Sequence, residues 1–204
     1  MTPYFQKPLD LGADIVVHSA TKYIGGHNDT IGGIVVSNSD EMVEHLRMQL
    51  KSHGNGLASL DSWLLIRGLK TLALRMEKHN ENAKVVAQCL RKQAKVKAVY
   101  YAGFEDHNGY DVMKKQSTGF GGMISFTVDN VDTVKQVLEK VDMIMFAESL
   151  GGTESLITYP MTQTHESIPA ARREMIGITE NFLRLSVGIE HVDDIIKDLE
   201  NALS

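Results

Sequence analysis

The sequence predicts an α/β protein in two parts, and three features of its hydrophobic pattern support this. Residues 13–20 form a short and nearly continuous apolar run, which is typical of a strand covered on both faces of a mostly parallel sheet. Residues 59–90 place apolar side chains at helical spacing among many good helix formers. Residues 122–203 change several times between strand-like and helix-like patterns. We therefore expect the end of an α/β domain, a connecting helix and a small α+β domain.

The first part, residues 1–57, has the pattern of two strands joined by a glycine-rich loop. The apolar run is followed by this loop at residues 25–33, and residues 34–37 resume strand character. A helix is expected to begin at Ser39 because serine is a good N-cap residue, and Gly54 interrupts its apolar pattern. Ligands of α/β proteins bind at such strand ends, so this loop marks a candidate binding site.

The remainder of the chain is expected to form a connecting helix and a small domain. Residues 58–95 are predicted to contain one long helix, which Ser59 or Asp61 could cap. Residues 96–204 are predicted to form an α+β domain whose sheet is covered on one side. Its strands are expected at residues 122–128, 143–147, 154–159 and 182–187, and its helices at residues 131–141 and 192–203.

Composition and charge favour a protein that acts on a small molecule. The 204 residues are 43% hydrophobic and 23% charged, which is ordinary for a globular protein that buries a core. The net charge of −5 is spread without basic runs, which argues against nucleic-acid binding. The apolar runs are too short to span a bilayer, residues 1–17 lack the pattern of a secretory signal, and the single cysteine, Cys89, cannot form an internal disulfide. We expect a cytoplasmic protein with no membrane attachment.

Lys22 directly follows the predicted first strand and has two hydroxyl side chains, Ser19 and Thr21, close by in sequence. A lysine amine that is partly desolvated at the mouth of a buried strand can form an imine with a carbonyl group. The two hydroxyls can donate hydrogen bonds to a phosphate. On these three residues alone a surface lysine is the simpler interpretation. The surrounding motif therefore has to distinguish a surface lysine from one that forms an imine.

Residues 8–27, with the sequence PLDLGADIVVHSATKYIGGH, resemble the cofactor-binding signature of the cystathionine γ-synthase and cystathionine lyase family. These enzymes of Cys and Met metabolism depend on pyridoxal 5'-phosphate (PLP) and have the aspartate-aminotransferase-like fold known as fold type I. The resemblance implies that residues 1–57 are the end of the PLP-binding large domain. It also implies that Lys22 binds the cofactor covalently and later moves protons between substrate carbons, while Ser19 and Thr21 bind the cofactor phosphate.

Two further motifs, AESLGGTESL at residues 147–156 and LRLSVGIE at residues 183–190, resemble the C-terminal motifs of the same family. Strand alternation places Arg184 on the opposite face from its two apolar neighbours. A guanidinium matches a carboxylate through two parallel hydrogen bonds, so Arg184 is suited to bind the α-carboxylate of an amino acid. An internal Arg–Glu pair is the alternative. The resemblance implies the carboxylate-binding role for Arg184, with help from Ser149.

Glu148 bears on the choice of substrate. In the resembling family a glutamate just before Ser-Leu-Gly is common among members that act at the γ-carbon, and Glu148 occupies that place. A carboxylate there can attract the second amino group of cystathionine, but Glu148 is equally well explained as an acceptor of backbone hydrogen bonds at a turn. Residues 157–160 and 163–165 look closer to bacterial β-lyases. We predict a γ-type lyase or synthase that acts on cystathionine, O-acylhomoserine, cysteine or homocysteine, with β-elimination as the alternative.

Members of the family are considerably longer than this chain, with the extra sequence on the N-terminal side. The resemblance places in that extra sequence an aspartate that pairs with the pyridine nitrogen of PLP and a tyrosine that stacks on the ring. We therefore expect the chain by itself to lack full activity. It is either part of a normal enzyme that forms a homodimer or homotetramer, or a non-catalytic interaction module.

Three histidines are weaker candidates for a functional site. His18 and His27 have no third ligand at a suitable spacing, so no metal site is expected. His165 lies in residues 162–165, which resemble a family loop near the substrate entrance. We therefore retain His165 as a secondary candidate for substrate contact.

Overall fold

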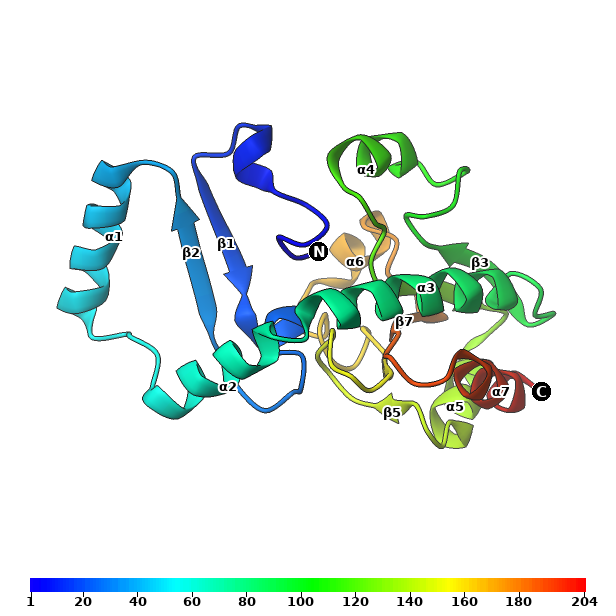
Figure 1. Cartoon of the computed structure of the whole chain (residues 1–204). Coiled ribbons are helices and arrows are strands. Elements are labelled where there is room, and N and C mark those ends of the chain that lie inside the picture. Colours follow the sequence, from blue (N-terminus) through cyan, green and yellow to red (C-terminus); the bar gives the residue numbers. More distant parts are fainter.

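A computed structural model describes residues 1–204 and confirms the α/β fold class (Figure 1). In chain order its elements are η1 Pro8–Leu11, β1 Ile15–Ser19, η2 Ala20–Ile24, β2 Gly33–Ser37, α1 Asp40–His53, α2 Ser59–Leu69, α3 Leu72–Leu90, β3 Val96–Tyr100, α4 Tyr110–Gln116, β4 Met123–Val128, α5 Val131–Lys140, β5 Met145–Phe146, β6 Leu156–Thr158, α6 Ala170–Met175, β7 Phe182–Ser186 and α7 Val192–Leu203. The first part, with β1, β2 and α1, lies on the left in Figure 1, and α2 and α3 lead from it to the second part.

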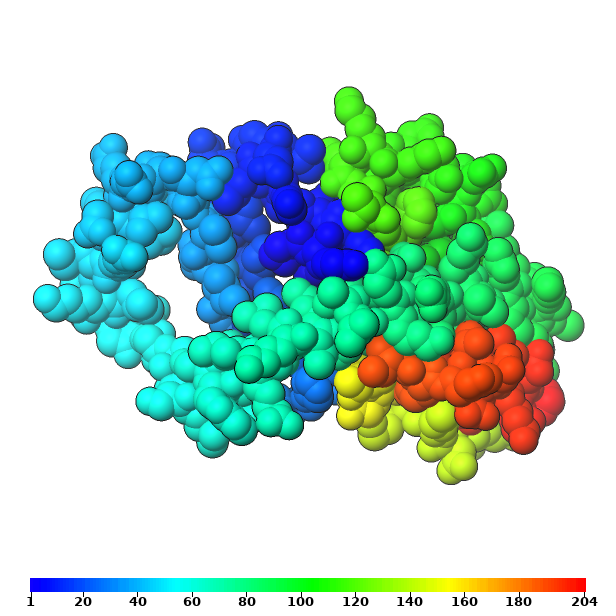
Figure 2. Space-filling model, in the orientation of Figure 1, coloured from blue at the N-terminus to red at the C-terminus, as the bar shows by residue number.

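The strand pair of the first part is present, but its surroundings differ from the sequence prediction. β1 pairs with β2 in antiparallel orientation, from Ile15 opposite Ser37 to Ser19 opposite Gly33. No third strand joins the pair, and Val17 is 71% exposed. The predicted strand covered on both faces of a mostly parallel sheet is therefore wrong for this chain, because no further strand of residues 1–204 pairs with β1. Figure 2 shows open space between α1 and β2.

Helix α1 follows the sequence prediction at both ends. The Ser39 hydroxyl accepts a hydrogen bond from the backbone N–H of Met42 at 3.3 Å. Asp40 and Glu41 lie in the first turn, where carboxylates interact favourably with the helix dipole. Gly54 ends the helix in a left-handed conformation with a φ of 67°. Local capping chemistry therefore accounts for the bounds of α1.

The single long helix expected within residues 58–95 is instead two helices, α2 and α3, which are separated at Lys70 and Thr71. Gly68, near the end of α2, packs so closely on η2 that a Cβ atom on it would overlap the carbonyl oxygen of Gly25. The Thr71 hydroxyl donates to the Gly68 carbonyl at 3.2 Å and closes the last turn of α2. Helical periodicity continues across this break, so the apolar pattern does not reveal it.

Substitution of Gly68 by alanine is expected to destabilise the protein, although alanine is the better helix former by about 1 kcal/mol. The added methyl group would overlap the Gly25 carbonyl oxygen, and overpacking of this kind costs about 1–3 kcal/mol. Denaturant unfolding of Gly68→Ala measures the loss. Gly56→Ala is the control, because a Cβ atom on Gly56 meets only open space. Equal stability of wild type and Gly68→Ala would contradict the close contact.

The second part is built on a five-stranded sheet in the order β3-β4-β7-β6-β5, in which only β5 and β6 run parallel. Residues of β4 alternate strictly between half-buried and buried, and those of β7 do so along most of the strand. Helices α3 and α5 contact β4, and α7 packs against both helices. The main core includes Phe126, Leu183, Leu185 and Ile195, all fully buried. This arrangement matches the predicted sheet covered on one side.

Three short elements of the second part are missing from the sequence prediction. They are β3, α4 and α6. β3 pairs with β4 through an irregular register, and α4 and α6 have only 7 and 6 residues, too few for a clear helical period. None of the helices combines the length and the apolar character that crossing a bilayer requires.

Candidate active site

Lys22 lies in η2, a wide single turn that directly follows β1. The N–H groups of Ala20 and Thr21 both donate to the carbonyl oxygen of Gly32, at 2.8 and 3.2 Å, which ties the turn to the residue before β2. Inside the turn Lys22 has non-helical dihedral angles, with a φ of −87° and a ψ of −135°. Its Nζ donates a hydrogen bond to Oγ of Ser149 at 3.0 Å, although 127 residues separate the two in sequence. The fold therefore brings two of the sequence motifs into contact.

Ser149 has a backbone conformation that non-glycine residues rarely adopt. Its φ is 110°, within the region that favours glycine. Such a conformation costs on the order of 1–3 kcal/mol and persists only where neighbouring contacts hold it. The Ser149 hydroxyl accepts from Lys22, and its carbonyl oxygen accepts from Nη2 of Arg184 at 3.3 Å. Ser149 therefore links the lysine to the arginine.

Arg184 is half-buried on β7 and has no carboxylate partner. Its Nη2 also donates to Oγ1 of Thr158 at 3.2 Å, and its Nε is buried without a hydrogen-bond partner. No acidic side chain lies within ion-pair distance, so the internal Arg–Glu pair considered above is not formed. Burial lowers the pKa of Arg184, and the negative charge of Glu148 acts in the opposite direction. A partly buried guanidinium with unused donor capacity is suited to bind a carboxylate.

The two hydroxyls near Lys22 differ in their surroundings. Oγ1 of Thr21 accepts from the backbone N–H of Gly32 at 3.0 Å and donates to its carbonyl oxygen at 3.4 Å. This hydroxyl therefore already ties η2 to β2. Ser19 is exposed at the end of β1, and its hydroxyl makes no hydrogen bond to a helix N–H. Of the two, Ser19 is the hydroxyl with more freedom to bind a ligand.

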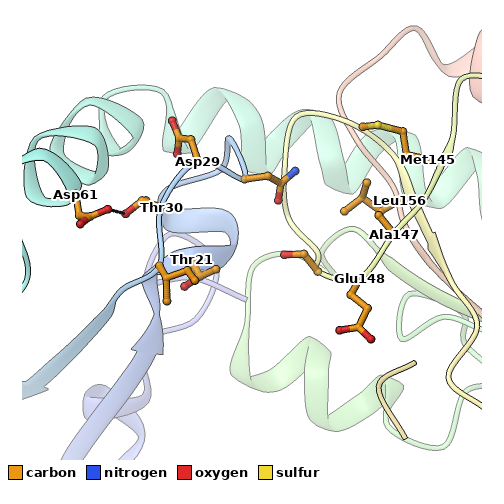
Figure 3. Close-up of a pocket in the computed structure, with 11 residues that line it drawn as sticks. Thr21, Asp29, Thr30, Asp61, Met145, Ala147, Glu148 and Leu156 are labelled. Atoms are coloured by element: carbon orange, nitrogen blue, oxygen red, sulfur yellow. Dashed lines mark hydrogen bonds between the residues drawn. The ribbon is translucent and has the colours of Figure 1, made fainter. Parts of the chain in front are cut away.

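A pocket of about 750 Å³ opens beside these residues, between the first and second parts (Figure 3). Thr21 and Asp61 line it from the first part, and Glu148 and Ser149 line it from the second. Figure 3 shows Thr21 and Glu148 on opposite sides of the pocket. Lys22 is not among the lining residues, but Ser149 both lines the pocket and accepts a hydrogen bond from the lysine amine.

Glu148 is exposed and contributes a carboxylate to the pocket wall. The hydrogen bonds of this turn use the carbonyl oxygen of Ala147 and both the carbonyl and hydroxyl oxygens of Ser149, and none uses the Glu148 carboxylate. The interpretation of Glu148 as an acceptor of backbone hydrogen bonds at a turn is therefore not observed. Its carboxylate remains available to a cationic group in the pocket.

The pocket also has a polar wall, formed by Asn28, Thr30 and Asp61, that was not predicted from the sequence. Asn28 has a φ of 53° and donates to the carboxylate of Glu154 at 3.1 Å, and Thr30 donates to Asp61 at 2.7 Å. An asparagine in a glycine-rich loop tolerates the left-handed conformation, which was the available signal. His165 is half-buried and does not line the pocket. No group of three or more His, Cys, Asp or Glu side chains is placed to hold a metal ion.

Comparison with known proteins relates the whole chain to one group of enzymes. A family model described as Cys/Met metabolism PLP-dependent enzyme matches residues 1–204. The chain belongs to this family. Over 202 residues it is 49% identical to the cystathionine β-lyase of Lactococcus lactis subsp. cremoris strain MG1363 and 50% identical to the cystathionine γ-lyase of Bacillus subtilis strain 168. Each match covers 99% of this chain and 53% of the relative.

Solved structures agree with this membership of the Cys/Met metabolism PLP-dependent enzymes. Cystathionine γ-synthase from Xanthomonas oryzae pv. oryzae in complex with cystathionine matches with a TM-score of 0.96 and 41% identity. The match covers 100% of this chain and 53% of the solved chain. The chain therefore has the fold of the corresponding half of that structure, and it spans about half the length of the curated relatives it matches.

Acid is expected to destabilise the protein through His79, which lies in α3 beside the site. Its Nδ1–H donates to the carbonyl oxygen of Val187 at 2.7 Å, and its ring meets Tyr23 edge-on with the ring centroids 5.0 Å apart. Burial lowers the pKa of His79 from 6.5 to about 4. Between these values the unfolded chain binds a proton that the native protein does not. The free energy of unfolding should therefore fall as the pH drops through this window, by up to about 3 kcal/mol.

Urea unfolding at several pH values from 7 to about 4 measures this dependence on pH. His79→Gln removes the titrating group and retains an amide that can donate to Val187, so its stability should depend less on pH over the same range. His53→Gln is the control, because His53 is exposed at the end of α1 and should leave the wild-type dependence intact. Parallel curves for wild type and His79→Gln would assign the acid sensitivity to other groups.

Proposed function

We propose that the complete enzyme containing this chain is a PLP-dependent enzyme that makes or breaks the C–S bond of cystathionine. The main support is the contact between Nζ of Lys22 and Oγ of Ser149, beside an Arg184 that has no carboxylate partner. An amine that can bind PLP and a guanidinium that can bind a carboxylate share one neighbour, which suits an amino-acid substrate. Relatives named cystathionine β-lyase and γ-lyase, and a solved γ-synthase holding cystathionine, support this choice of substrate.

The residues at the end of β1 fit the cofactor. The Lys22 amine has a hydroxyl partner and no carboxylate partner, so no ion pair has to be broken before it can react. We assign the covalent bond to the cofactor to Lys22 and the contacts with its phosphate to Ser19 and Thr21. The three residues lie at the end of β1 and in the turn η2 that directly follows it.

PLP, when bound, supplies an electron sink that stabilises negative charge at the substrate carbons. The freed Lys22 amine would act as base and acid, moving protons between Cα, Cβ and Cγ of the substrate and protonating the sulfur that leaves. Arg184 binds the α-carboxylate, which fixes the orientation of the bonds at Cα. Ser149 accepts a hydrogen bond from the lysine through its hydroxyl and one from the arginine through its carbonyl oxygen. It therefore fixes the position of the base relative to the carboxylate-binding site.

The activity can be tested in a fused enzyme, in which this chain follows the N-terminal half of the Bacillus subtilis cystathionine γ-lyase to which it is 50% identical. We propose γ-type chemistry, with β-elimination as the alternative, because relatives of both kinds are similarly close. Cystathionine is supplied and the products are quantified. Cysteine and 2-oxobutanoate indicate γ-cleavage, whereas homocysteine and pyruvate indicate β-cleavage. Failure to yield either pair would contradict the proposed function.

Glu148 is expected to favour substrates with a second, distal amino group. Because its carboxylate is exposed, the attraction is modest, and Glu148→Gln should raise KM for cystathionine about two- to fivefold. KM for cysteine, which lacks the distal group, should not change. Glu154→Gln is a control, since this carboxylate is engaged by Asn28 and does not line the pocket. An unchanged preference for cystathionine over cysteine would rule out this role for Glu148.

A second candidate function is that of a non-catalytic interaction module. It is motivated by apolar side chains that remain exposed on β1 and β2, among them Ile15, Val17 and Val35. Size-exclusion chromatography of the chain, alone and with a separately produced N-terminal half of the Bacillus subtilis relative, distinguishes the two candidates. Activity that emerges only in the mixture would reject a purely structural role. An oligomer of the chain that binds no PLP would favour the purely structural role.

A further inference from the structure

Arg75 in α3 is a buried cation without a counter-ion. Only 3% of its surface is exposed, and no carboxylate lies within ion-pair distance. A buried charge of this kind is costly unless its hydrogen bonds are satisfied, and an apolar side chain would fill the same space without that cost. The contacts of Arg75 therefore have to explain why a guanidinium occupies this position.

The Arg75 side chain donates four hydrogen bonds, all of them to the turn η2 and to the junction between α2 and α3. Nη1 donates to the carbonyl oxygen of Tyr23 at 2.7 Å, and Nη2 donates to that of Ile24 at 3.3 Å. Nη2 also donates to the carbonyl oxygen of Gly68 at 2.8 Å, and Nε donates to Oγ1 of Thr71 at 3.0 Å. The guanidinium thus joins two segments that are far apart in sequence.

The carbonyl groups of Tyr23 and Ile24 are the two that directly follow Lys22. No backbone N–H from outside η2 donates to either of them, so Arg75 supplies their hydrogen bonds. The residues after the turn leave room for the guanidinium: Gly26 has a φ of 73°, and a Cβ atom on it would overlap Arg75. The sequence of the loop is therefore matched to the presence of the arginine.

We propose that Arg75 is a positioning residue for Lys22: by binding the two carbonyls that follow it, Arg75 holds η2 in the non-helical conformation that directs the Lys22 amine to Ser149. The Arg75 side chain is buried and its donors are occupied by backbone carbonyls and Thr71, so it acts through the backbone and not by touching a ligand. The effect of Arg75 on catalysis rests on the function proposed above. Its effect on the conformation of η2 does not depend on that function.

The test compares wild type, Arg75→Met and Arg75→Lys of the full 204-residue chain by hydrogen–deuterium exchange. The N–H groups of Gly25 and Gly26 report on the turn directly, because they donate to Ala20 and Lys22 at 2.8 Å. Loss of hydrogen bonds to a charged group should accelerate exchange over residues 20–26 at least about tenfold in Arg75→Met, with partial rescue in Arg75→Lys. Arg91→Met, at the far end of α3, is the matched control and should leave residues 20–26 unchanged.

A second readout, made in the fused enzyme described above, is the labelling of Lys22 by PLP and borohydride, measured by mass spectrometry relative to the exposed Lys135. Labelling of Lys22 should fall at least about tenfold in Arg75→Met, since a disordered turn no longer presents the amine. Unchanged exchange over residues 20–26, or an acceleration shared equally by residues 182–186 of β7, would overturn the positioning role. If exchange responds as expected but wild-type Lys22 takes no label, the positioning role stands and the proposed function fails.

Discussion

Replacement of Lys22 by alanine in the fused enzyme should abolish the C–S chemistry and the visible absorption of lysine-bound PLP. Lys22 is assigned two roles, the covalent attachment of the cofactor and the transfer of protons. General acid–base catalysis alone contributes about 10²–10⁴-fold to a rate, so kcat/KM for cystathionine should fall by at least that factor. Unlike Arg75, the Lys22 side chain makes a single hydrogen bond, to Ser149, so its removal should change the fold little.

Absorption spectra with added PLP and steady-state rates with cystathionine measure both roles of Lys22. Lys135→Ala is the matched control, because Lys135 is exposed and contacts only Asp132 three residues away. Lys22→Arg retains the positive charge but not a nucleophilic amine, so it should be as inactive as Lys22→Ala. Visible absorption of equal intensity in wild type and Lys22→Ala would assign the cofactor to another amine.

Much of the candidate site could be predicted from the sequence because local rules apply there. The apolar run just before Lys22 and the alternation around Arg184 are short patterns, and the flanking motifs made their interpretation specific. The structure places both residues against Ser149, a contact that spans 127 residues and that no local pattern describes. It depends on a wide turn with non-helical angles at Lys22 and on a positive φ at Ser149, which amino-acid propensities disfavour.

The parts that could not be predicted are those in which tertiary contacts outweigh local preference. The junction between α2 and α3 forms where Gly68 approaches the backbone of Gly25, although the surrounding residues favour an uninterrupted helix. Arg75 lies among apolar residues at helical spacing, where an arginine would be expected to reach solvent. Its burial is explained by the carbonyls of Tyr23 and Ile24, which accept hydrogen bonds from Arg75.

The apolar run over residues 13–20 shows a different limit. Its composition correctly indicates a strand, but the cover that such a strand requires is not supplied by residues 1–204. Two small buried clusters anchor the first part, one of Ala20, Ile24 and Leu65 and one of Phe5, Tyr23 and Met76, whereas the main core lies wholly in α3 and the second part. A sequence pattern reports that apolar side chains need burial, not which chain buries them.

Arg184 is expected to account for most of the selectivity for amino acids over simple amines. Loss of one partner of a buried, hydrogen-bonded charge pair costs about 2–5 kcal/mol, so Arg184→Ala should lower kcat/KM for cystathionine by roughly 30-fold to several thousandfold. Arg184→Lys retains the charge but not the paired donors and should lose about one to two orders of magnitude. PLP absorption should persist in both variants, because Arg184 is assigned to the substrate and not to the cofactor.

Two inhibitors that differ only in the α-carboxylate, norleucine and pentylamine, separate carboxylate binding from a general disturbance of the site. Wild type should bind norleucine much more tightly, and Arg184→Lys should lose that preference while its affinity for pentylamine stays the same. Arg172→Lys is the matched control, since Arg172 is exposed on α6. If Arg184→Lys weakened both inhibitors equally, the arginine would be acting on the shape of the site through Ser149 and Thr158, and the carboxylate would have to be bound elsewhere.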